Sequence, residues 1–487
     1  MSELNVGIVG FDITPEIDPK LGAWGTTPSL TEVDMPLLAR CVALRQDDRL
    51  LLWYGSDLIG DGLADTLKLR EDLAAMLDLR ADQVLWSSSQ SHSSGALPGS
   101  EHSGSSAAAV AKSDAEKTAA ARQTFLNKYA VAGRQAIEKL QPANVWAGNG
   151  YCDSVSYNSR LPLPTGGNKF SRNYAEGLQS GKFFDTTIGL IRFEDKQGRP
   201  LGAIFNFCCH PAVMVADKYV SPDYVGTTRQ HVEDTIDGAP AMFLQGFCGD
   251  VHCHYMFGTP EHAKRLGTRL GVEAAKAMSR LVPLRAEPFH WAFRTIDIPS
   301  EPMLTQEKID AEVAERTRYT AELAEDPTAV WCAGKNIAEQ LTPEQRLGEI
   351  QQALVYFEEL SRMLARGEQP PAARPITLGA VRIGDIGCVL SPGENFALTG
   401  LHIRQRSPFL HTMICGDTNG LFSYIGTDDE IDRGGFETET VWRHVPYDGM
   451  RLAPGKGASQ RIVNACSGLL EDLVGKNGAD AAANGSG

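Results

Sequence analysis

Residues 201–211 read LGAIFNFCCHP, an apolar run of strand length that ends at His210 and Pro211. A short apolar run that stops at a proline is typical of a buried β-strand. The strand therefore delivers a histidine at its carboxyl end. Strand ends hold side chains more rigidly than free loops do, which favours a functional role for this position.

Histidines follow two further predicted strands. His92 comes after the run 84–86, and His252 and His254 come after the run 241–244. Three histidine-bearing strand ends predict a site on the rim of a sheet. His252 and His254 are two residues apart, so in an extended segment they point to the same side. The alternative, in which each histidine separately bonds a backbone carbonyl, stays open at this level.

The remaining segments alternate between strand and helix patterns, which predicts an α/β fold. Predicted strands lie at 6–10, 41–44, 50–54, 84–86, 186–193, 201–207 and 241–244, and predicted helices at 62–78, 113–140 and 260–281. We expect one large unit over 1–475, followed by a disordered tail at 476–487. The serine-rich stretch 87–106 is either a flexible linker or a loop that faces a substrate.

Residues 304–366 predict a helical hairpin. Thr342, Pro343 and Gln345 supply a cap, a first-turn proline and a capping-box partner in order. The apolar residues from Leu347 to Leu364 then recur at spacings of three and four, which gives one apolar stripe. The hairpin is either an insertion or a dimerisation arm, so a homo-oligomer is one expectation.

The net charge of the chain argues against two kinds of binding partner. The 487 residues include 46 Lys and Arg against 61 Asp and Glu, a formal net charge of −15. This charge argues against binding nucleic acid or an anionic membrane, and no apolar run has the length of a membrane span. The amino terminus lacks a signal-peptide pattern, and the ten cysteines lack framework spacing. We therefore expect a cytoplasmic protein with reduced thiols that acts on a small molecule.

Two further motifs carry candidate chemistry. Glu394 in Pro392-Gly393-Glu394 follows a predicted strand and is expected on the first turn of a helix, where it would either act chemically or cap the helix. Tyr424 lies in a predicted turn and strand over 419–426. The chain has no His-Glu-x-x-His motif, no Gly-x-Ser-x-Gly elbow and no P-loop.

In their order along the chain, these pieces resemble the neutral/alkaline ceramidase family in its amidase domain. The matching segments are VGIVGFDITP at 6–15, SDL at 56–58, SQSHS at 89–93, NFCCHP at 206–211, SPDYVG at 221–226, QGFCGDV at 245–251, PGE at 392–394 and NGLFSYI at 419–425. The resemblance implies mixed β-sheets flanked by helices, with the site at strand ends. The resemblance covers the amidase domain, we expect no counterpart of the family's additional C-terminal β-domain, and ceramide is not the expected substrate.

The family binds one zinc ion with two histidines, a glutamate and a tyrosine. The resemblance assigns three of these ligands to His210, Glu394 and Tyr424. The fourth position falls on Gln90, which is a poor zinc ligand beside imidazole. Either His92 replaces it, or Gln90 binds weakly, or the metal differs.

The expected activity is zinc-dependent hydrolysis of an amide or similar bond by metal-activated water. His252 stands where the family has a serine, and we expect it to transfer protons, with Asp250 orienting it or a neighbouring loop. Arg160 is a further catalytic candidate, within a basic stretch at 158–182 that either attracts an anionic group or forms a solvated surface. A metal-dependent lyase or isomerase acting on a hydroxylated substrate, and a non-catalytic binding protein, are the alternatives.

Overall fold

The structure is a computed structural model. It describes residues 2–16, 30–95, 97–98, 115–164, 166–215, 217–329, 342–444 and 452–475. The predicted disordered tail at 476–487 and Cys332 lie outside these residues. No helix within these ranges combines the length and the hydropathy that crossing a bilayer requires.

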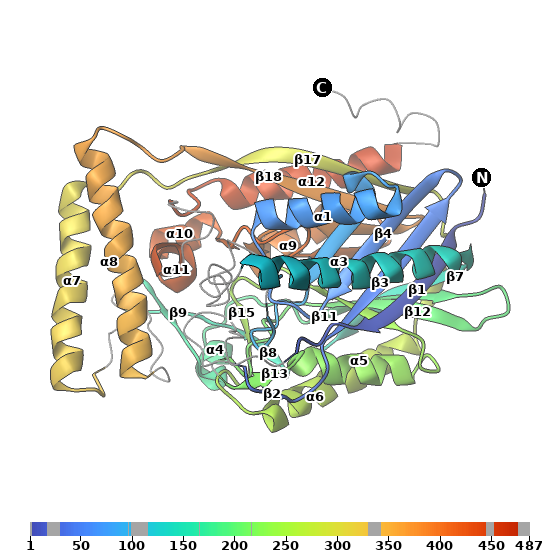
Figure 1. The fold of residues 1–487 in the computed structure, drawn as a ribbon, viewed down its shortest axis with the longest axis horizontal. Coiled ribbons are helices and arrows are strands. Elements are labelled where there is room, and N and C mark those ends of the chain that lie inside the picture. The colour runs from blue at the N-terminus through green and yellow to red at the C-terminus, as the bar shows by residue number, and fades with distance from the viewer. Residues whose placement is uncertain are drawn as a thin grey trace.

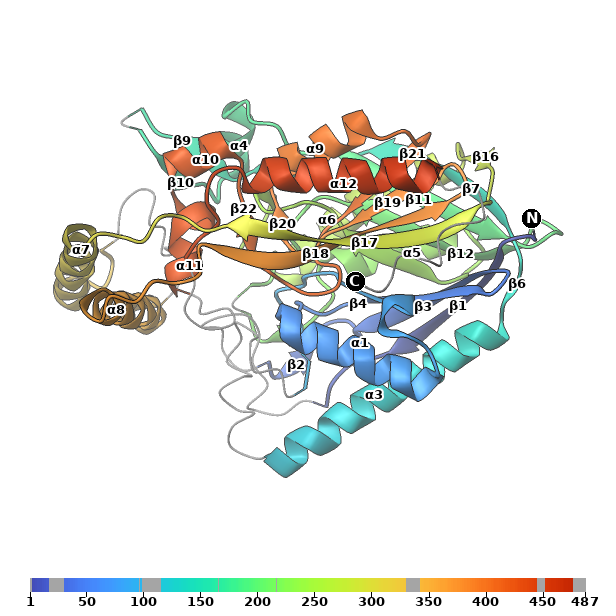
Figure 2. The same ribbon diagram turned by 90° about the horizontal axis from the view of Figure 1, so that it is seen from above.

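Three mixed β-sheets form the body of the molecule (Figures 1 and 2). In the first sheet the order is β5 (Val84–Ser88), β4 (Arg49–Ser56), β3 (Leu38–Gln46), β1 (Asn5–Asp12) and β6 (Gln141–Pro142). In the second it is β14 (Ala241–Gln245), β12 (Pro200–Phe207), β11 (Thr187–Glu194), β7 (Asn144–Tyr151) and β16 (Val282–Leu284). In the third it is β17 (Phe289–Pro299), β18 (Ala373–Ile383), β19 (Ile386–Leu390) and β21 (His411–Cys415).

Helices pack against one face of each sheet. The first carries α1 (Leu63–Leu77) and α3 (Ala115–Glu138), the second α5 (Tyr224–Asp234) and α6 (Pro260–Met278), and the third α9 (Ala397–Arg406) and α12 (Ala458–Gly475). The other faces of all three sheets meet in one shared apolar core. This arrangement confirms the predicted fold of mixed sheets flanked by helices.

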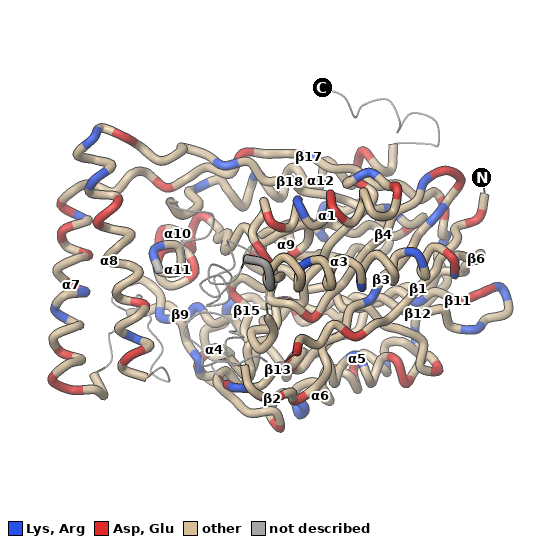
Figure 3. Tube along the Cα trace, viewed as in Figure 1, with Lys and Arg blue, Asp and Glu red and all other residues tan. Residues whose placement is uncertain are grey.

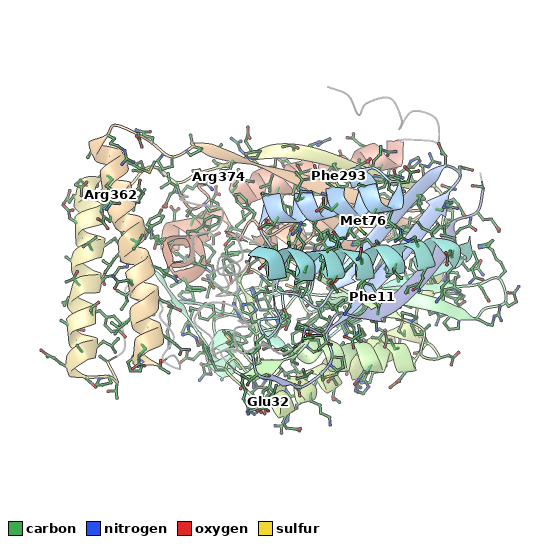
Figure 4. All side chains as sticks on the ribbon, viewed as in Figure 1. Phe11, Glu32, Met76, Phe293, Arg362 and Arg374 are labelled. Carbon is green, nitrogen blue, oxygen red and sulfur yellow. The ribbon has the colours of Figure 1, made fainter. Side chains whose placement is uncertain are left out.

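The strands are apolar on both faces because both faces are covered. In β4, Leu51 and Trp53 lie in the shared core, while Leu52 and Tyr54 pack under α1 and α3. Successive strand residues point to opposite faces, so a strand buried on both sides reads as a continuous apolar run. Figure 4 shows the side chains filling the space between these layers.

Each of the three sheets contains one parallel pair at an edge. The pairs are β4 with β5, β12 with β14, and β19 with β21. Parallel strands point their carboxyl ends to the same side, and ligand sites of α/β proteins gather there. The loops that follow these strands build the candidate site.

Short elements join the sheets. The short strand pairs are β2 (Glu32–Val33) with β13 (Tyr219–Val220), β8 (Ser156–Asn158) with β15 (Val251–Cys253), β9 (Arg160–Pro162) with β10 (Asn168–Phe170), and β20 (Glu394–Asn395) with β22 (Tyr424–Ile425). The short helices are α4 (Tyr174–Gln179), α10 (Asp428–Arg433) and α11 (Val441–His444), and a single π-turn spans Phe436–Thr440.

The predicted helical hairpin is present as α7 (Gln306–Glu325) and α8 (Pro343–Ala365), with the Thr342–Gln345 capping box in place. It projects from one end of the body (Figure 1). Acidic and basic residues are interspersed along both helices (Figure 3). The hairpin packs through its own small core around Phe357 and Leu360.

Three sequence expectations are corrected. The helix expected from Glu394 begins at Ala397, because Glu394 pairs in β20 instead. The serine-rich stretch is buried from Ser87 to Ser94, so this part is not a linker. The basic stretch 158–182 is not a solvated surface throughout, because it contains β9, β10 and α4 and because Arg160 is fully buried.

Candidate metal and catalytic site

Backbone pairing brings the predicted site residues together from distant parts of the chain. Glu394 in β20 lies directly opposite Tyr424 in β22. His210, just after β12, forms an isolated bridge with His252 in β15. The four residues therefore come from the ends of the second and third sheets, and neighbouring backbone fixes their positions.

His210 is fully buried at the centre of this group. Its Nδ1 lies 3.1 Å from the carbonyl oxygen of Val251, which accepts a hydrogen bond and so holds the proton on Nδ1. In the neutral ring Nε2 then carries a lone pair. That atom lies 3.0 Å from Oε2 of Glu394 and 3.3 Å from the hydroxyl of Tyr424. A lone pair facing a carboxylate is repulsive, so the arrangement needs a proton or a metal ion between the two groups.

His92 lies beside this group, with its ring centroid 5.7 Å from that of His210. Its Nδ1 donates to the carbonyl oxygen of Gln90 at 2.9 Å, which directs Nε2 away from that carbonyl. The Gln90 side chain instead accepts from the thiol of Cys248 at 3.5 Å. Burial, and then the neighbouring His210, lower the pKa of His92 to about 3.

His252 stacks on His210, with ring centroids 4.2 Å apart and ring planes 9° from parallel. It is 3% exposed, and neither ring nitrogen has a hydrogen-bond partner in the described part of the chain. Burial lowers its pKa well below the ordinary value, and His210, His92 and Arg172 lower it further. The ring is therefore neutral near pH 7, which departs from the ordinary histidine pKa assumed from sequence.

Asp250 orients neighbouring loops and not the His252 ring. Its Oδ1 accepts from the Ala397 backbone amide at 2.8 Å, and its Oδ2 accepts from the Asn158 side chain at 2.7 Å. Burial raises the pKa of Asp250 to about 6, against these hydrogen bonds. The carboxyl group thereby joins the start of α9 to β8. Of the two roles expected for Asp250, its hydrogen bonds to Asn158 and Ala397 fit the second, the orientation of a neighbouring loop.

Arg160 belongs to a separate buried network. Its Nε donates to Glu430 and its Nη1 to Glu437, both at 2.5 Å. Its Nη2 donates to the carbonyl oxygens of Glu430 and Gly434. Because every nitrogen of the fully buried guanidinium is engaged, this geometry fits a structural role and we do not carry Arg160 into the proposed catalysis. The position is not the solvated surface considered from sequence.

Sequence reasoning missed Asp417. This residue is 2% exposed, and neither of its carboxylate oxygens has a hydrogen-bond partner among the described residues. Burial raises its pKa well above the ordinary value, and the nearby Glu394 carboxylate raises it further. Its φ of 45° is one of several positive values around the site, with Gln90, Asn419 and Ser423. Strained backbone of this kind clusters at functional sites.

The donor set fits a zinc ion in part. Within the described ranges, no group of three or more His, Cys, Asp or Glu side chains is close enough to hold a metal. Of the three donors that converge here, His210 and Glu394 belong to these residue types, and the third donor is the hydroxyl of Tyr424. Ligands about 2.0–2.1 Å from a tetrahedral zinc lie about 3.3–3.4 Å from each other. The separations of 3.0 and 3.3 Å around Nε2 of His210 are close to that value.

Comparison with known proteins establishes the fold class. No protein-family model matches the sequence, and no curated protein sequence matches it either. The structure is similar to that of neutral ceramidase from Pseudomonas aeruginosa, with a TM-score of 0.64 and 19% identity over 96% of this chain and 75% of that chain. A ceramidase complexed with C2 gives a TM-score of 0.64 and 18% identity, covering 98% of this chain and 77% of that chain.

The chain therefore has a ceramidase-like α/β fold, the fold of known hydrolases. At this level of identity the likeness concerns the fold alone.

Proposed function

We propose that this protein is a metal-dependent hydrolase that cleaves an amide or similar bond in a small polar molecule, with Zn²⁺ as the cofactor. The observation that carries the proposal is the convergence of His210, Glu394 and Tyr424. The Glu394 carboxylate and the Tyr424 hydroxyl lie 3.0 and 3.3 Å from Nε2 of His210, whose ring proton is held on the other nitrogen. A proton or a divalent cation relieves the repulsion between the Nε2 lone pair and the Glu394 carboxylate, and we propose the cation because a hydroxyl oxygen, a carboxylate and an imidazole nitrogen are all zinc-ligand types.

In this proposal His210, Glu394 and Tyr424 hold the metal, with His92 as a candidate fourth ligand. The Val251 carbonyl fixes the His210 tautomer, a hydrogen bond of the kind that orients metal-bound histidines. A bound zinc ion lowers the pKa of water to about 7 and polarises a carbonyl group.

His252 is the proposed proton-transfer group. It is neutral, it lies against the ring of His210, and its nitrogens are not committed to other described residues. A neutral imidazole accepts a proton from an attacking water molecule or donates one to a leaving group. Asp250 is a positioning residue, because it holds the start of α9 next to β20.

We propose a small polar amide, ester or lactone as the substrate. The named neighbours act on ceramide, but this chain differs from their family at Gln90 and His252. A lyase or isomerase is the second candidate, because a free base beside a Lewis acid also suits proton abstraction next to a carbonyl. A binding protein that has lost catalysis is the third.

One experiment separates these functions. The purified protein is analysed for metal and then screened against amides, esters and sugar lactones in isotopically labelled water. A hydrolase holds about one metal ion per chain and places the label in the product. Turnover without the label favours a lyase or isomerase. Protein that neither retains metal nor turns over any substrate contradicts the proposal.

We also propose that the protein works in the cytoplasm. The nine described cysteines are all buried and free of disulfides. Reduced thiols of this kind are typical of that compartment.

A further inference from the structure

We propose that Arg172 binds a carboxylate group of the substrate, so that the molecule cleaved at this site is an anionic amide such as an N-acyl amino acid. This inference rests on the proposed function, because it names the substrate class of the same site. Arg172 is half-buried and lies between β10 and α4, in the basic stretch whose role the sequence left open.

Two aromatic rings hold the guanidinium of Arg172 in place. Its central carbon, Cζ, lies 4.8 Å from the ring centroid of Phe170 and 5.8 Å from that of Phe257. Contacts of this kind attract the cation to the ring face without using its N–H donors. They therefore fix the direction of the planar fork with which an arginine binds a carboxylate through two hydrogen bonds.

The first of these rings joins Arg172 to the proposed proton-transfer group. Phe170 contacts the His252 ring edge to face, with centroids 4.8 Å apart and planes at 79°. Burial, His210 and His92 lower the pKa of His252, and the charge of Arg172 also lowers it. Two ring contacts in sequence span about 10 Å, which is the length of a small molecule such as an N-acyl amino acid.

The other cations of this basic stretch have carboxylate partners within the chain. Arg160 and Lys182 share Glu430. Lys169 is more exposed and pairs with Glu176. These three cations stabilise the fold around the site. By its position beside the proposed proton-transfer group, the guanidinium that the two rings hold is the cation best placed to meet a substrate.

The α7–α8 hairpin fixes the second ring. Phe257 packs against Tyr319 of α7 and Ile350 of α8. Burial raises the pKa of Glu349, also on α8, to about 7, and the charge of Arg172 opposes this rise. Because that pKa lies near neutrality, Glu349 is partly uncharged at pH 7, which reduces its repulsion toward a substrate carboxylate. The hairpin therefore contributes to the surroundings of Arg172.

A carboxylate fits this position better than a phosphate. One guanidinium carries one positive charge and matches one carboxylate. A phosphate carries a charge of about −1.5 to −2 near pH 7. The carboxylates of Glu349 and Glu394 would oppose the excess negative charge.

The test compares matched acids and amides on the full chain as purified. The N-acetyl derivatives of glycine, leucine and phenylalanine are paired with their carboxamides, which have nearly the same shape and lack the charge. Release of acetate gives kcat and KM for the N-acetyl bond. Calorimetric titration with the same compounds measures binding, so one readout does not depend on turnover. We expect wild type to favour each acid over its carboxamide.

Arg172→Gln removes the charge that this preference requires. Hydrogen bonds to charged groups are strong enough that KM and Kd for the acids should rise about 10–100-fold. The value of kcat should stay within about threefold, because a group that binds substrate and transition state equally affects KM. Values for the carboxamides should not change.

Three further variants isolate the role of the charge. Arg172→Lys should recover part of the affinity, because it restores the charge but not the planar fork. Glu349→Gln should lower KM for the acids, because it removes a nearby negative charge. Lys169→Gln, the matched control from the same basic stretch, should stay within about threefold of wild type in kcat and KM.

Each outcome supports or overturns the inference. If wild type releases acetate but treats acids and carboxamides alike, Arg172 does not bind the substrate and the proposed function stands. If it binds the acids with the Arg172 dependence described but releases no acetate, the hydrolase proposal fails and this inference stands. Lower thermal stability of Arg172→Gln with equal losses on acids and carboxamides would make Arg172 structural. Protein that neither binds nor cleaves any of the acids contradicts the inference.

Discussion

Two buried polar clusters lie side by side in this protein, and they differ in how completely their hydrogen bonds are satisfied. In the Arg160 cluster, one guanidinium is matched to Glu430 and Glu437, with Ser159 and Asn168 donating to the same carboxylates. In the His210 cluster, a lone pair faces a carboxylate, and His252 and Asp417 have no hydrogen-bond partners in the described part of the chain.

This difference in hydrogen bonding indicates which of the two clusters can still bind a ligand. A network whose donors and acceptors are matched has no capacity left for a ligand, while unpaired buried groups cost free energy that a ligand can recover. Arg160 lies over the ring of Phe396, two residues from Glu394, so the two clusters share this part of the fold. The Arg160 cluster therefore packs against the segment that carries Glu394.

The largest expected effect comes from removing a central donor of the His210 cluster. We expect His210→Ala and Glu394→Ala each to abolish metal retention and activity, because too few donors remain to hold zinc against a chelator. Metal analysis of the dialysed variants checks this. If both kept about one ion per chain, the proposed ligand set would be wrong.

The next effect concerns the histidine that lies over this centre. His252→Ala should lower turnover by about 10²–10⁴-fold while the metal stays bound, because general acid–base catalysis contributes about that much. His252→Ser should not restore turnover, since a hydroxyl does not accept a proton near pH 7 without a partner base. Steady-state kinetics on metal-loaded protein measures both. Joint loss of metal and activity would make His252 a ligand.

Removing the guanidinium from the Arg160 cluster should instead lower the free energy of unfolding. Arg160→Met leaves the buried Glu437 carboxylate without its cation, while Glu430 keeps its ion pair with Lys182, and breaking such a buried pair costs about 3–5 kcal/mol of unfolding free energy. Denaturant unfolding at neutral pH measures the loss, and metal content per folded chain is the control. If Arg160→Met kept the stability of wild type and lost only turnover, Arg160 would be a catalytic residue.

The smallest effect is on the thiols behind the His210 cluster. Burial holds the pKa of Cys208 and of Cys248 well above the ordinary value, so both should be unreactive in the native protein. Thiol counting should find ten reduced cysteines after denaturation and very few before it. A clear shortfall in freshly prepared protein would argue against the proposed cytoplasmic location.

Local sequence patterns were sufficient for the strands that precede the histidines, but they did not predict the long strands β7, β17 and β18. The apolar runs that become β4, β12 and β14 are long enough and apolar enough to predict strands buried on both faces. The capping box at Thr342 likewise predicted the start of α8. The buried contacts of Arg160 and the strand position of Glu394 were not predicted, because their partners lie far away in the chain, at Glu430 and Tyr424.

The sequence by itself therefore determined the α/β class, the three histidine-bearing strand ends and the helical hairpin, because each depends on periodicity or capping within a few neighbouring residues. Only the tertiary structure decided which polar groups are satisfied. Asp417 is an ordinary residue in the sequence, and only the meeting of three sheets buries its carboxylate oxygens with no hydrogen-bond partner among the described residues. Whether a buried group is satisfied is a property of contacts between distant segments, and no local pattern encodes it.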